Sequence, residues 1–471
     1  MNYIDKSISK KKLKEFILAL IDEGTDPHAF ELHRDGKLLI RMGISPYSTK
    51  DKRQLFSLSK TFAATALGLA YDRGLVKPSD RMVDIFPEYV PQDPSENLLN
   101  MTVHNVMTMN TGHKSCTLPD IARSDDGIRA FFNREVPLVP GTKYAYNSGA
   151  SYMLNAIVER LTGVSAFDYM YEHFFMPLGI IPQKWQTSGA NGINEGGIGL
   201  FISSEDVQKL GLVYLNGGTY NGKRILSEEW VRMASSYQVT TVGNGTGNWS
   251  AGYGYQIWLN ENDGYRGDGA FGQFCTVLPK LNCVFTMLAE STATDKYFGR
   301  LLDFAADCFI DDGEEEIDIE GFFENLYAPE YSSEASVCNA NAYYKLDENP
   351  MGFTRLHAIS DGERLDLSFS DGVCIQTISA GNGEWIESNL IAKNVKPVLM
   401  QLAVPNRVEH SRIAASYKKS NDGFEIAIRY LNAPHKGIWK ISLGDELKID
   451  ISYRTAELRE DAYCITGSII R

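Results

Sequence analysis

The chain has 471 residues, of which 43% are hydrophobic and 23% are charged, and its formal net charge is −14 at pH 7. This length exceeds what a single hydrophobic core organises, so we expect two domains, or one large domain with an appendage. The acidic balance argues against nucleic acid and anionic membrane surfaces as partners, because both would repel the chain.

The N-terminal segment and the cysteines exclude further classes of protein. Residues 1–16 lack the apolar core of a secretory signal, and no uninterrupted apolar run is long enough to span a bilayer. We therefore expect a cytoplasmic protein, or a chain from which a leader has been removed. The 7 cysteines and 8 histidines are dispersed, so a disulfide framework, a metal site and a metal-dependent mechanism have no support in the sequence, and no cofactor is expected.

The chain begins with a helix and a hairpin. Apolar residues at helical spacing predict an amphipathic helix over residues 10–23. Two apolar runs, 29–33 and 37–42, flank Asp35-Gly36, and Asp-Gly between apolar runs is a strong hairpin signal. Two strands therefore precede the next helix.

That next helix, residues 54–71, carries Ser57 and Lys60 near its N-terminus. Their spacing puts a hydroxyl and an amine on one helical face, and the first turn offers free N–H groups to a developing negative charge. Most residues behind them are apolar, so we expect the helix to be buried nearly all round and the lysine to be poorly solvated. Desolvation disfavours the charged amine and makes Lys60 a base for the Ser57 proton.

The alternative is an N-cap serine followed by an exposed first-turn lysine, because the spacing alone is not specific. The same Ser-x-x-Lys spacing recurs in polar or strand-like surroundings at three other places, Ser7/Lys10, Ser9/Lys12 and Ser416/Lys419.

Tyr146 lies at a second candidate catalytic position, where an extended segment meets a helix. After a short predicted helix over 102–109, Pro140-Gly141 makes a turn, residues 143–146 run extended, and a helix begins near Ser148. A side chain at such a junction can reach a cleft, although a core or surface tyrosine is the plainer interpretation.

The remaining predicted elements of the first half are a helix capped by Ser203 or Ser204, three strands and a final helix. The strands cover 253–258, 272–278 and 282–288, with 264–270 in the turns between them, and the final helix covers about 297–310.

The second half of the chain has a different pattern. A charge run at 311–318 is the best linker candidate, and from about Tyr343 short alternating segments follow at intervals typical of an all-β sandwich or barrel. We expect a lid, a dimerisation surface or a packing module there. The predicted strands are 352–358, 364–370, 374–379, 397–404, 411–419, 424–430, 437–442, 447–454 and 462–469.

With Ser57-x-x-Lys60, Tyr146 and a glycine-rich strand entry at 267–270, the chain resembles the serine hydrolases of the β-lactamase and penicillin-binding family. Within the family it is most similar to class C β-lactamases, D,D-carboxypeptidases and related esterases. The resemblance covers roughly residues 10–310. It implies a β-lactamase-like serine hydrolase domain at 1–320, of the α/β class (an α+β sandwich), in which an antiparallel sheet packs against helices. An all-β domain, a sandwich or a barrel, follows at 321–471.

The resemblance also implies the roles of the site residues. Ser57 is the nucleophile, Lys60 shares or removes its proton, and Tyr146 protonates the leaving group and activates water. The backbone N–H groups of Ser57 and Ala270 form an oxyanion hole, while glycines at 267 and 269 let substrate approach the strand edge.

Two departures from the family pattern concern substrate binding. Where the family has Tyr-x-Asn, this chain has Tyr146-Asn147-Ser148, so either Ser148 substitutes for the amide or Asn147 points inward. Where the family has Lys or His before x-Gly, the chain has Gly267-Asp268-Gly269, and Arg266 and His113 are candidates to replace that cation. Asp268 is either a turn residue or a site residue.

We therefore expect an enzyme that forms an acyl-enzyme on Ser57 and hydrolyses small esters or amides. β-Lactamase or D,D-carboxypeptidase activity is the first alternative, but β-lactam recognition depends on a carboxylate-binding cation. The second alternative is a binding or sensory protein that has lost turnover. The expected partner is a small-molecule substrate, and the C-terminal domain is a candidate surface for a homo-oligomer.

Overall fold

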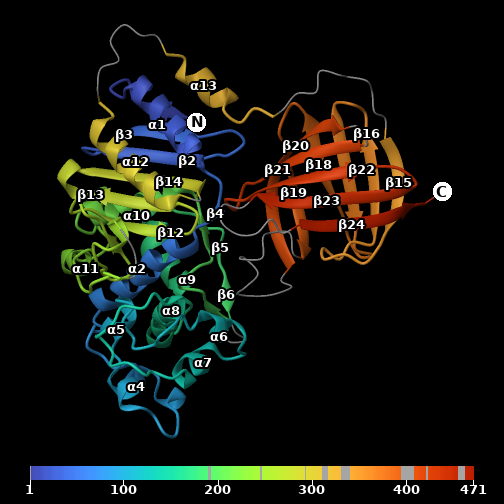
Figure 1. Cartoon of the computed structure of the whole chain (residues 1–471). Coiled ribbons are helices and arrows are strands. Elements are labelled where there is room, and N and C mark those ends of the chain that lie inside the picture. Colours follow the sequence, from blue (N-terminus) through green and yellow to red (C-terminus); the bar gives the residue numbers. More distant parts are fainter. Residues whose placement is uncertain are drawn as a thin grey trace. The chain divides into compact units, whose positions relative to one another are not determined.

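The computed structural model describes residues 2–188, 192–243, 247–291, 293–309, 317–329, 340–393, 408–420, 423–454 and 462–470. The chain forms two compact units, each with its own hydrophobic core (Figure 1). The first unit consists of Met1–Met42 and Thr49–Glu315, and the second of Gly43–Ser48 and Glu316–Arg471.

The first unit is built on a seven-stranded sheet with the order β1-β3-β2-β14-β13-β12-β11. Both ends of the unit contribute to it, because β2 pairs antiparallel with β14 from Arg34↔Cys283 to Thr25↔Ser291. The strands are β1 Tyr3–Ile4, β2 Thr25–Arg34, β3 Lys37–Gly43, β11 Trp258–Leu259, β12 Tyr265–Gly269, β13 Gln273–Leu278 and β14 Cys283–Ser291.

Helices pack against this sheet and against one another. The helices α1 (Lys10–Asp22) and α12 (Thr294–Asp307) pack together, with Phe16 stacked on Phe304. The helix α10 (Ser204–Leu215) packs on β13 and β14, and α2 (Ser59–Asp72) packs on α8 (Ser148–Thr162). Of the residues of α2, positions 59–70 are all buried, as the sequence predicts.

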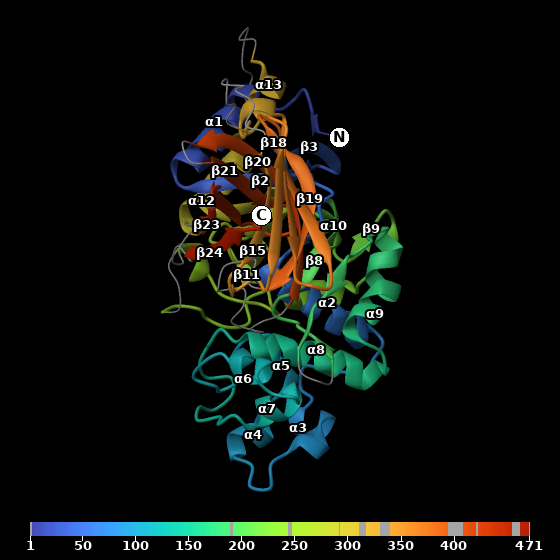
Figure 2. The same ribbon diagram turned by 90° about the vertical axis from the view of Figure 1, so that its right-hand side faces the viewer.

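Short helices gather at one end of the first unit, away from α1 and α12 (Figures 1 and 2). They are α4 Glu96–Asn100, α5 Val103–Met107, α6 Leu118–Ala122 and α7 Gly127–Asn133. The other short elements of this unit are α3 Met82–Ile85, α9 Ala166–Met170, α11 Glu228–Ala234, β4 Arg53–Gln54, β5 Lys184–Trp185, β6 Thr187–Ser188, β7 Ile193–Asn194, β8 Leu200–Ile202, β9 Thr219–Tyr220 and β10 Lys223–Arg224.

The second unit is a β-barrel preceded by α13 (Ile319–Asn325). Nine strands follow one another in the order β18-β17-β16-β15-β24-β23-β22-β21-β20, and a parallel pairing of β18 with β20 closes the ring; β19 pairs with β20 in addition. The strands are β15 Ala340–Leu346, β16 Arg355–Ser360, β17 Arg364–Ser370, β18 Ile375–Asn382, β19 Ile386–Lys393, β20 Val408–Ser420, β21 Gly423–Tyr430, β22 Lys436–Ser442, β23 Glu446–Arg454 and β24 Ala462–Ile469.

The predicted fold class is confirmed, and of sandwich and barrel the barrel is correct. Alternating burial along β17, β21 and β22 fills the interior with apolar side chains, including Trp439. The strands β15 and β19 were not predicted. The predicted strand 397–404 and most of the predicted linker 311–318 lie outside the described residues.

Two predictions in the first unit are wrong. Residues 264–270 were expected in a turn, but Tyr265–Gly269 forms β12 and pairs with β13 along its whole length. The turn lies one step later, at Phe271 and Gly272, whose φ angles are 64° and 86°. Residues 253–258 were expected to be a strand, but Gln256 has a φ of 57° and only Trp258–Leu259 enters the sheet.

Candidate active site

Ser57 lies in a tight turn just before α2. It is the middle residue of a 3₁₀ turn, Phe56–Leu58, and α2 begins at Ser59, so the serine precedes the helix where the sequence placed it in the first helical turn. Phe56 has a φ of 50°, which is strained for a bulky residue, and its ring packs edge-on against Phe271 at 5.2 Å. The packing stabilises a backbone conformation that presents Ser57 at the start of the helix.

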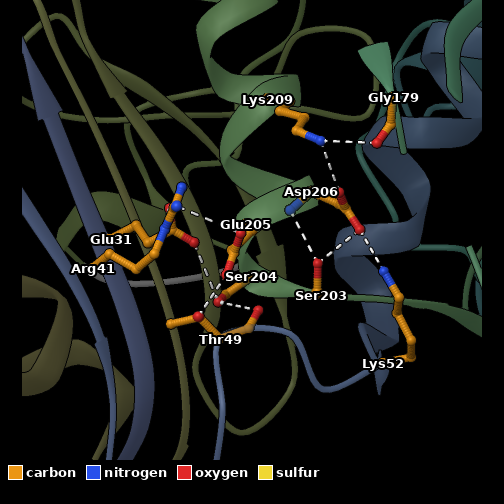
Figure 3. A network of polar contacts seen from close by, with 10 residues as sticks. All are labelled: Glu31, Arg41, Thr49, Lys52, Gly179, Ser203, Ser204, Glu205, Asp206 and Lys209. Atoms are coloured by element: carbon orange, nitrogen blue, oxygen red, sulfur yellow. Dashed lines mark hydrogen bonds and ion pairs between the residues drawn. The ribbon is translucent and has the colours of Figure 1, made fainter. Parts of the chain in front are cut away.

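The segment that leads into this turn is fixed to the start of α10 (Figure 3). Thr49 Oγ1 donates to the Glu205 carboxylate at 2.7 Å, and Lys52 Nζ donates to Asp206 at 2.6 Å. Ser204 Oγ donates to the carbonyl of Thr49 at 3.1 Å. Because β4 follows directly, these contacts restrain the chain that carries Ser57.

A buried carboxylate joins the same network to the central sheet (Figure 3). Arg41 donates to Glu31 through Nε and Nη2, at 3.1 and 3.0 Å, and its Nη1 lies 3.6 Å from Glu205. Burial raises the pKa of Glu31 to about 7, although the Arg41 guanidinium acts in the opposite direction. Strands β2 and β3 are thereby tied to α10 by polar contacts as well as by apolar packing.

Lys60 is completely enclosed and its amine has three partners. Its exposed fraction is 1%. Nζ lies 3.1 Å from Ser57 Oγ, 2.9 Å from Ser148 Oγ and 2.7 Å from the carbonyl oxygen of Gly197. An ammonium group has three N–H donors, and these partners match them one for one. The amine is therefore held in hydrogen-bond reach of the Ser57 hydroxyl.

Burial makes the neutral form of Lys60 accessible at neutral pH. Burial lowers the pKa of the amine to about 7, and Cys116 and Asp268 oppose that shift by electrostatic attraction. At neutral pH a substantial fraction of Lys60 is therefore a free amine that can accept a proton.

Tyr146 lies next to both Lys60 and Ser57. Its ring is stacked on Trp258 at 6.0 Å with an interplanar angle of 22°, and Lys60 Nζ lies 4.8 Å from its centroid. Burial raises the pKa of the Tyr146 hydroxyl, while a hydrogen bond with Ser57 acts against that shift. The phenol is therefore protonated at neutral pH and suits the role of proton donor. The residue as a whole is 37% exposed.

Of the two residues after Tyr146, it is Ser148 that contacts the lysine. Asn147 caps the N-terminus of α8, because its Oδ1 accepts from the backbone N–H groups of Gly149 and Ala150 at 3.0 and 3.3 Å. The same oxygen accepts from the backbone N–H and the hydroxyl of Thr117 at 2.9 and 3.0 Å. Asn147 is thus a buried structural residue.

The strand β12 carries the remaining predicted residues alongside the Ser57 turn. A Cβ atom on Gly267 would meet Leu58 Cδ1 at 2.2 Å, and one on Gly269 would meet the carbonyl oxygen of Leu55 at 2.3 Å. Position 269 therefore requires glycine, because the atom it would meet is backbone, whereas a side chain at 267 would require Leu58 to move. Ala270, which follows the strand, is exposed.

Neither candidate for the missing cation supplies one. The Arg266 side chain is fully buried, and its Nε donates to Asp268 at 3.0 Å. His113 is buried against Phe131, and burial lowers its pKa to about 4, so the ring is neutral at pH 7. A side chain at 267 is obstructed unless Leu58 moves.

Gly197 is a site residue that was not predicted from the sequence. Its carbonyl is the nearest partner of Lys60, and the preceding Gly196 lies so close to α8 that a Cβ there would meet the carbonyl oxygen of Ser151 at 1.9 Å. The pair Gly196-Gly197 indicates a close approach of the backbone to another element. The acceptor of the Lys60 amine, however, is a backbone carbonyl, and a backbone carbonyl has no side-chain motif by which the sequence could identify it.

Other kinds of site find no support. Within the described ranges, no group of three or more His, Cys, Asp or Glu residues is placed to hold a metal ion. No helix in the part of the chain that the structure describes is both long and apolar enough to cross a membrane.

Comparisons with known proteins show what the chain is similar to. A family model described as "Beta-lactamase" matches residues 29–307. The 6-aminohexanoate-dimer hydrolase of Paenarthrobacter ureafaciens is 24% identical over 288 residues, which are 57% of this chain and 74% of that protein.

Two solved structures share the fold. An octameric penicillin-binding protein homologue from Pyrococcus abyssi has a TM-score of 0.52 at 15% identity and covers 97% of this chain and 100% of its own. A family VIII carboxylesterase has a TM-score of 0.51 at 18% identity and covers 65% of this chain and 99% of its own.

Proposed function

The chain belongs to the β-lactamase family of serine hydrolases, and from this premise we propose that it hydrolyses small esters or amides through an acyl-enzyme on Ser57. The observation that carries the proposal is the buried amine of Lys60, 3.1 Å from the Ser57 hydroxyl. A lysine whose pKa is lowered to about 7 is a competent base at neutral pH.

Acylation begins when neutral Lys60 accepts the Ser57 proton as the serine oxygen attacks the substrate carbonyl. The backbone N–H groups of Ser57 and Ala270 are proposed to stabilise the resulting oxyanion. Tyr146, which is protonated at rest, then donates its proton to the leaving alcohol or amine as the carbonyl–leaving-group bond breaks, and it regains a proton from the Lys60 ammonium. The acyl group is then bound to the serine oxygen.

Deacylation consumes one water molecule. The water loses a proton to the Lys60 and Tyr146 pair while its oxygen attacks the acyl carbon. When the bond to Ser57 breaks, the serine oxygen takes that proton back. The net reaction is hydrolysis of one ester or amide to an acid and an alcohol or amine, with the enzyme unchanged.

The segment Gly267-Asp268-Gly269 of β12 favours small esters and amides over β-lactams as substrates. The position where the family has a cation is Gly267, which packs on Leu58, and Arg266 and His113 do not replace it. Among relatives, one is named a 6-aminohexanoate-dimer hydrolase and one solved structure is named a family VIII carboxylesterase. β-Lactamase or D,D-carboxypeptidase activity is therefore the second candidate, and a binding protein without turnover is the third.

The proposal is tested by turnover of 4-nitrophenyl acetate and 4-nitroacetanilide. We expect hydrolysis by the wild type, loss of at least about 10³-fold in Ser57→Ala, and a loss of about 10²-fold or more in Tyr146→Phe, which keeps the ring. Ser7→Ala is the matched control, because Ser7 has the same spacing to a lysine but is exposed. Equal turnover by Ser57→Ala and wild type would refute the assignment, and unchanged turnover by Tyr146→Phe would remove the tyrosine from the mechanism.

A further inference from the structure

Tyr146 has a fixed backbone, but its ring needs a further contact to hold it in place. The Ala145 N–H donates to the carbonyl oxygen of Met109 at 2.8 Å, and the Asn147 N–H donates to Met109 Sδ at 3.3 Å. The side chain between them can still rotate about its own bonds, and the residue is 37% exposed. The fixed backbone therefore does not by itself place the hydroxyl beside Ser57.

The indole of Trp258 supplies a surface for this ring. The two rings are stacked, with their centroids 6.0 Å apart and an angle of 22° between their planes. Lys60 Nζ lies 4.8 Å from the centroid of the same tyrosine ring. The phenol therefore packs against the indole while it borders the amine of the site, and a rotation that carried the ring away from Lys60 would disrupt the stack.

Trp258 is itself buried and held at both its backbone and its ring. Its backbone pairs with Arg266 of β12 and forms a β-bridge with Tyr253. The rings of Tyr253 and Tyr144 pack on the indole with centroid distances of 4.9 and 6.0 Å and interplanar angles of 80° and 62°. Because the indole is enclosed in this way, it is a rigid support for the more exposed ring of Tyr146.

We propose that Trp258 is a positioning residue for Tyr146 and holds the phenol where its hydroxyl can protonate the leaving group. This inference rests on the proposed function, since it concerns the proton that Tyr146 donates during acylation. Proton transfer requires the donor within hydrogen-bond reach of the acceptor, and a displacement of a catalytic group by about 1 Å can cost about 10²-fold in rate. Loss of the indole should therefore slow the step in which Tyr146 acts, while activation of Ser57 by Lys60 is largely kept.

Two acetate esters with different leaving groups test the proposal. The 4-nitrophenolate ion leaves readily without a proton, whereas phenolate is more basic and depends more on the Tyr146 proton. In Trp258→Leu, which keeps an apolar side chain but no ring, kcat/KM for phenyl acetate should fall about 10- to 100-fold, and at least about fivefold more than for 4-nitrophenyl acetate. Trp258→Phe keeps a ring and should recover most of this loss. Wild-type values in Trp258→Leu, or equal losses for both esters, would overturn the proposal.

A double variant then assigns the effect to Tyr146. When Trp258→Leu is added to Tyr146→Phe, kcat/KM should fall by no more than about threefold, because the proton donor is already absent. The matched control is Trp249→Leu, since the Trp249 ring packs on Phe274 and Phe298 in the same unit, and it should leave the ratio of the two esters unchanged. A loss in the Tyr146→Phe background as large as in the wild-type background would overturn the assignment.

Folding and the reactivity of Ser57 are measured separately from ester turnover. Melting temperatures show whether Trp258→Leu is folded, and Trp258→Met, whose flexible side chain also fills space without a ring, replaces it if it is not. A fluorophosphonate releases fluoride, which leaves without a proton, so the variants should be labelled on Ser57 at close to the wild-type rate. If the wild type is labelled but the variants show no leaving-group effect, only the positioning role is wrong. If the wild type is not labelled, the proposed function fails, and this inference fails with it.

Discussion

Lys60 combines complete burial with a full set of hydrogen-bond partners, and this combination explains why it can act as a base. In water an amine with a pKa near 10.4 is protonated at neutral pH and cannot accept the serine proton. Enclosure at 1% exposure lowers the pKa to about 7, while Ser57, Ser148 and the Gly197 carbonyl keep the nitrogen in place. Reactivity and position thus come from the same environment.

The first prediction concerns the pH dependence of acylation. Because Lys60 must be neutral to take the proton, kcat/KM should rise with pH, with an apparent pKa near 7, and level off above it. The measurement is a pH–rate profile for a neutral ester. Tyr146→Phe should have a lower kcat/KM but show the same rise with pH, because Lys60 is intact. A limb centred above about 9 would show that Lys60 is charged in the resting enzyme.

The same burial carries a cost in stability, and its sign can be checked. The folded-state pKa of Lys60 is lowered, so between about pH 7 and 10.4 the unfolded chain binds a proton that the folded protein has released. The free energy of unfolding should therefore rise with pH across this window relative to Lys60→Met. Chemical unfolding of both proteins at pH 7 and pH 9.5 measures the difference. A constant difference would mean that the pKa is not lowered.

At the scale of elements, the longer helices of the first unit, α1, α2, α8, α10 and α12, could be predicted from capping residues and apolar periodicity. Ser9 and Ser203 accept hydrogen bonds from the first turns of α1 and α10, and α8 begins at Ser148 as expected, with Gly163 in the left-handed conformation at its end. The capping residues determine where these helices begin and end, and they can be identified from the sequence alone.

The elements that could not be predicted depend on distant partners. The strand β12 contains two glycines, which have low strand propensity, and its conformation is imposed by pairing with β13 and by packing on the Ser57 turn. Closure of the barrel depends on β18 meeting β20, far apart in the chain. In the site, the Ser-x-x-Lys spacing pointed to the Ser57 and Lys60 pair, but the Gly197 carbonyl is a backbone atom with no pattern of its own.

The second prediction tests the glycine segment that supplies that carbonyl. In Gly196→Ala the new methyl group would meet the Ser151 carbonyl at 1.9 Å, so the segment must move away from α8 and take the Gly197 carbonyl from Lys60. We expect a lower melting temperature and at least about a tenfold loss of kcat.

The matched control for this glycine is Gly299, in α12, where an added methyl group has open space. Gly299→Ala should leave activity intact and leave stability unchanged or raise it by up to about 1 kcal/mol. Wild-type behaviour of Gly196→Ala in both melting and turnover would contradict the proposed role of the segment.

The whole molecule contains two units, each of which has its own hydrophobic core. One apolar cluster fills the catalytic unit, and another fills the barrel, where Trp439 is fully buried. All residues proposed to act on substrate lie in the first unit. For the barrel we propose the role of a lid, a dimerisation surface or a packing module.

The third prediction separates the stabilities of the two units. Trp439→Ala removes a large side chain from the barrel core and should destabilise that unit by about 3 to 5 kcal/mol. We expect two calorimetric transitions, of which only one moves. Val373→Ala, at a barrel position that is 91% exposed, is the control and should move neither. A single transition that shifts as a whole would show that the two cores unfold together.

The central claim is that Ser57 is a nucleophile activated by Lys60, and covalent labelling tests it most directly. The wild-type protein is incubated with a fluorophosphonate at pH 8, and its intact mass and peptide map are recorded beside those of Ser57→Ala and Lys60→Met. We expect one adduct, located on Ser57, absent from Ser57→Ala and formed at least about 10³-fold more slowly in Lys60→Met. No adduct on the wild type, or an adduct on another residue such as Ser148, would contradict it.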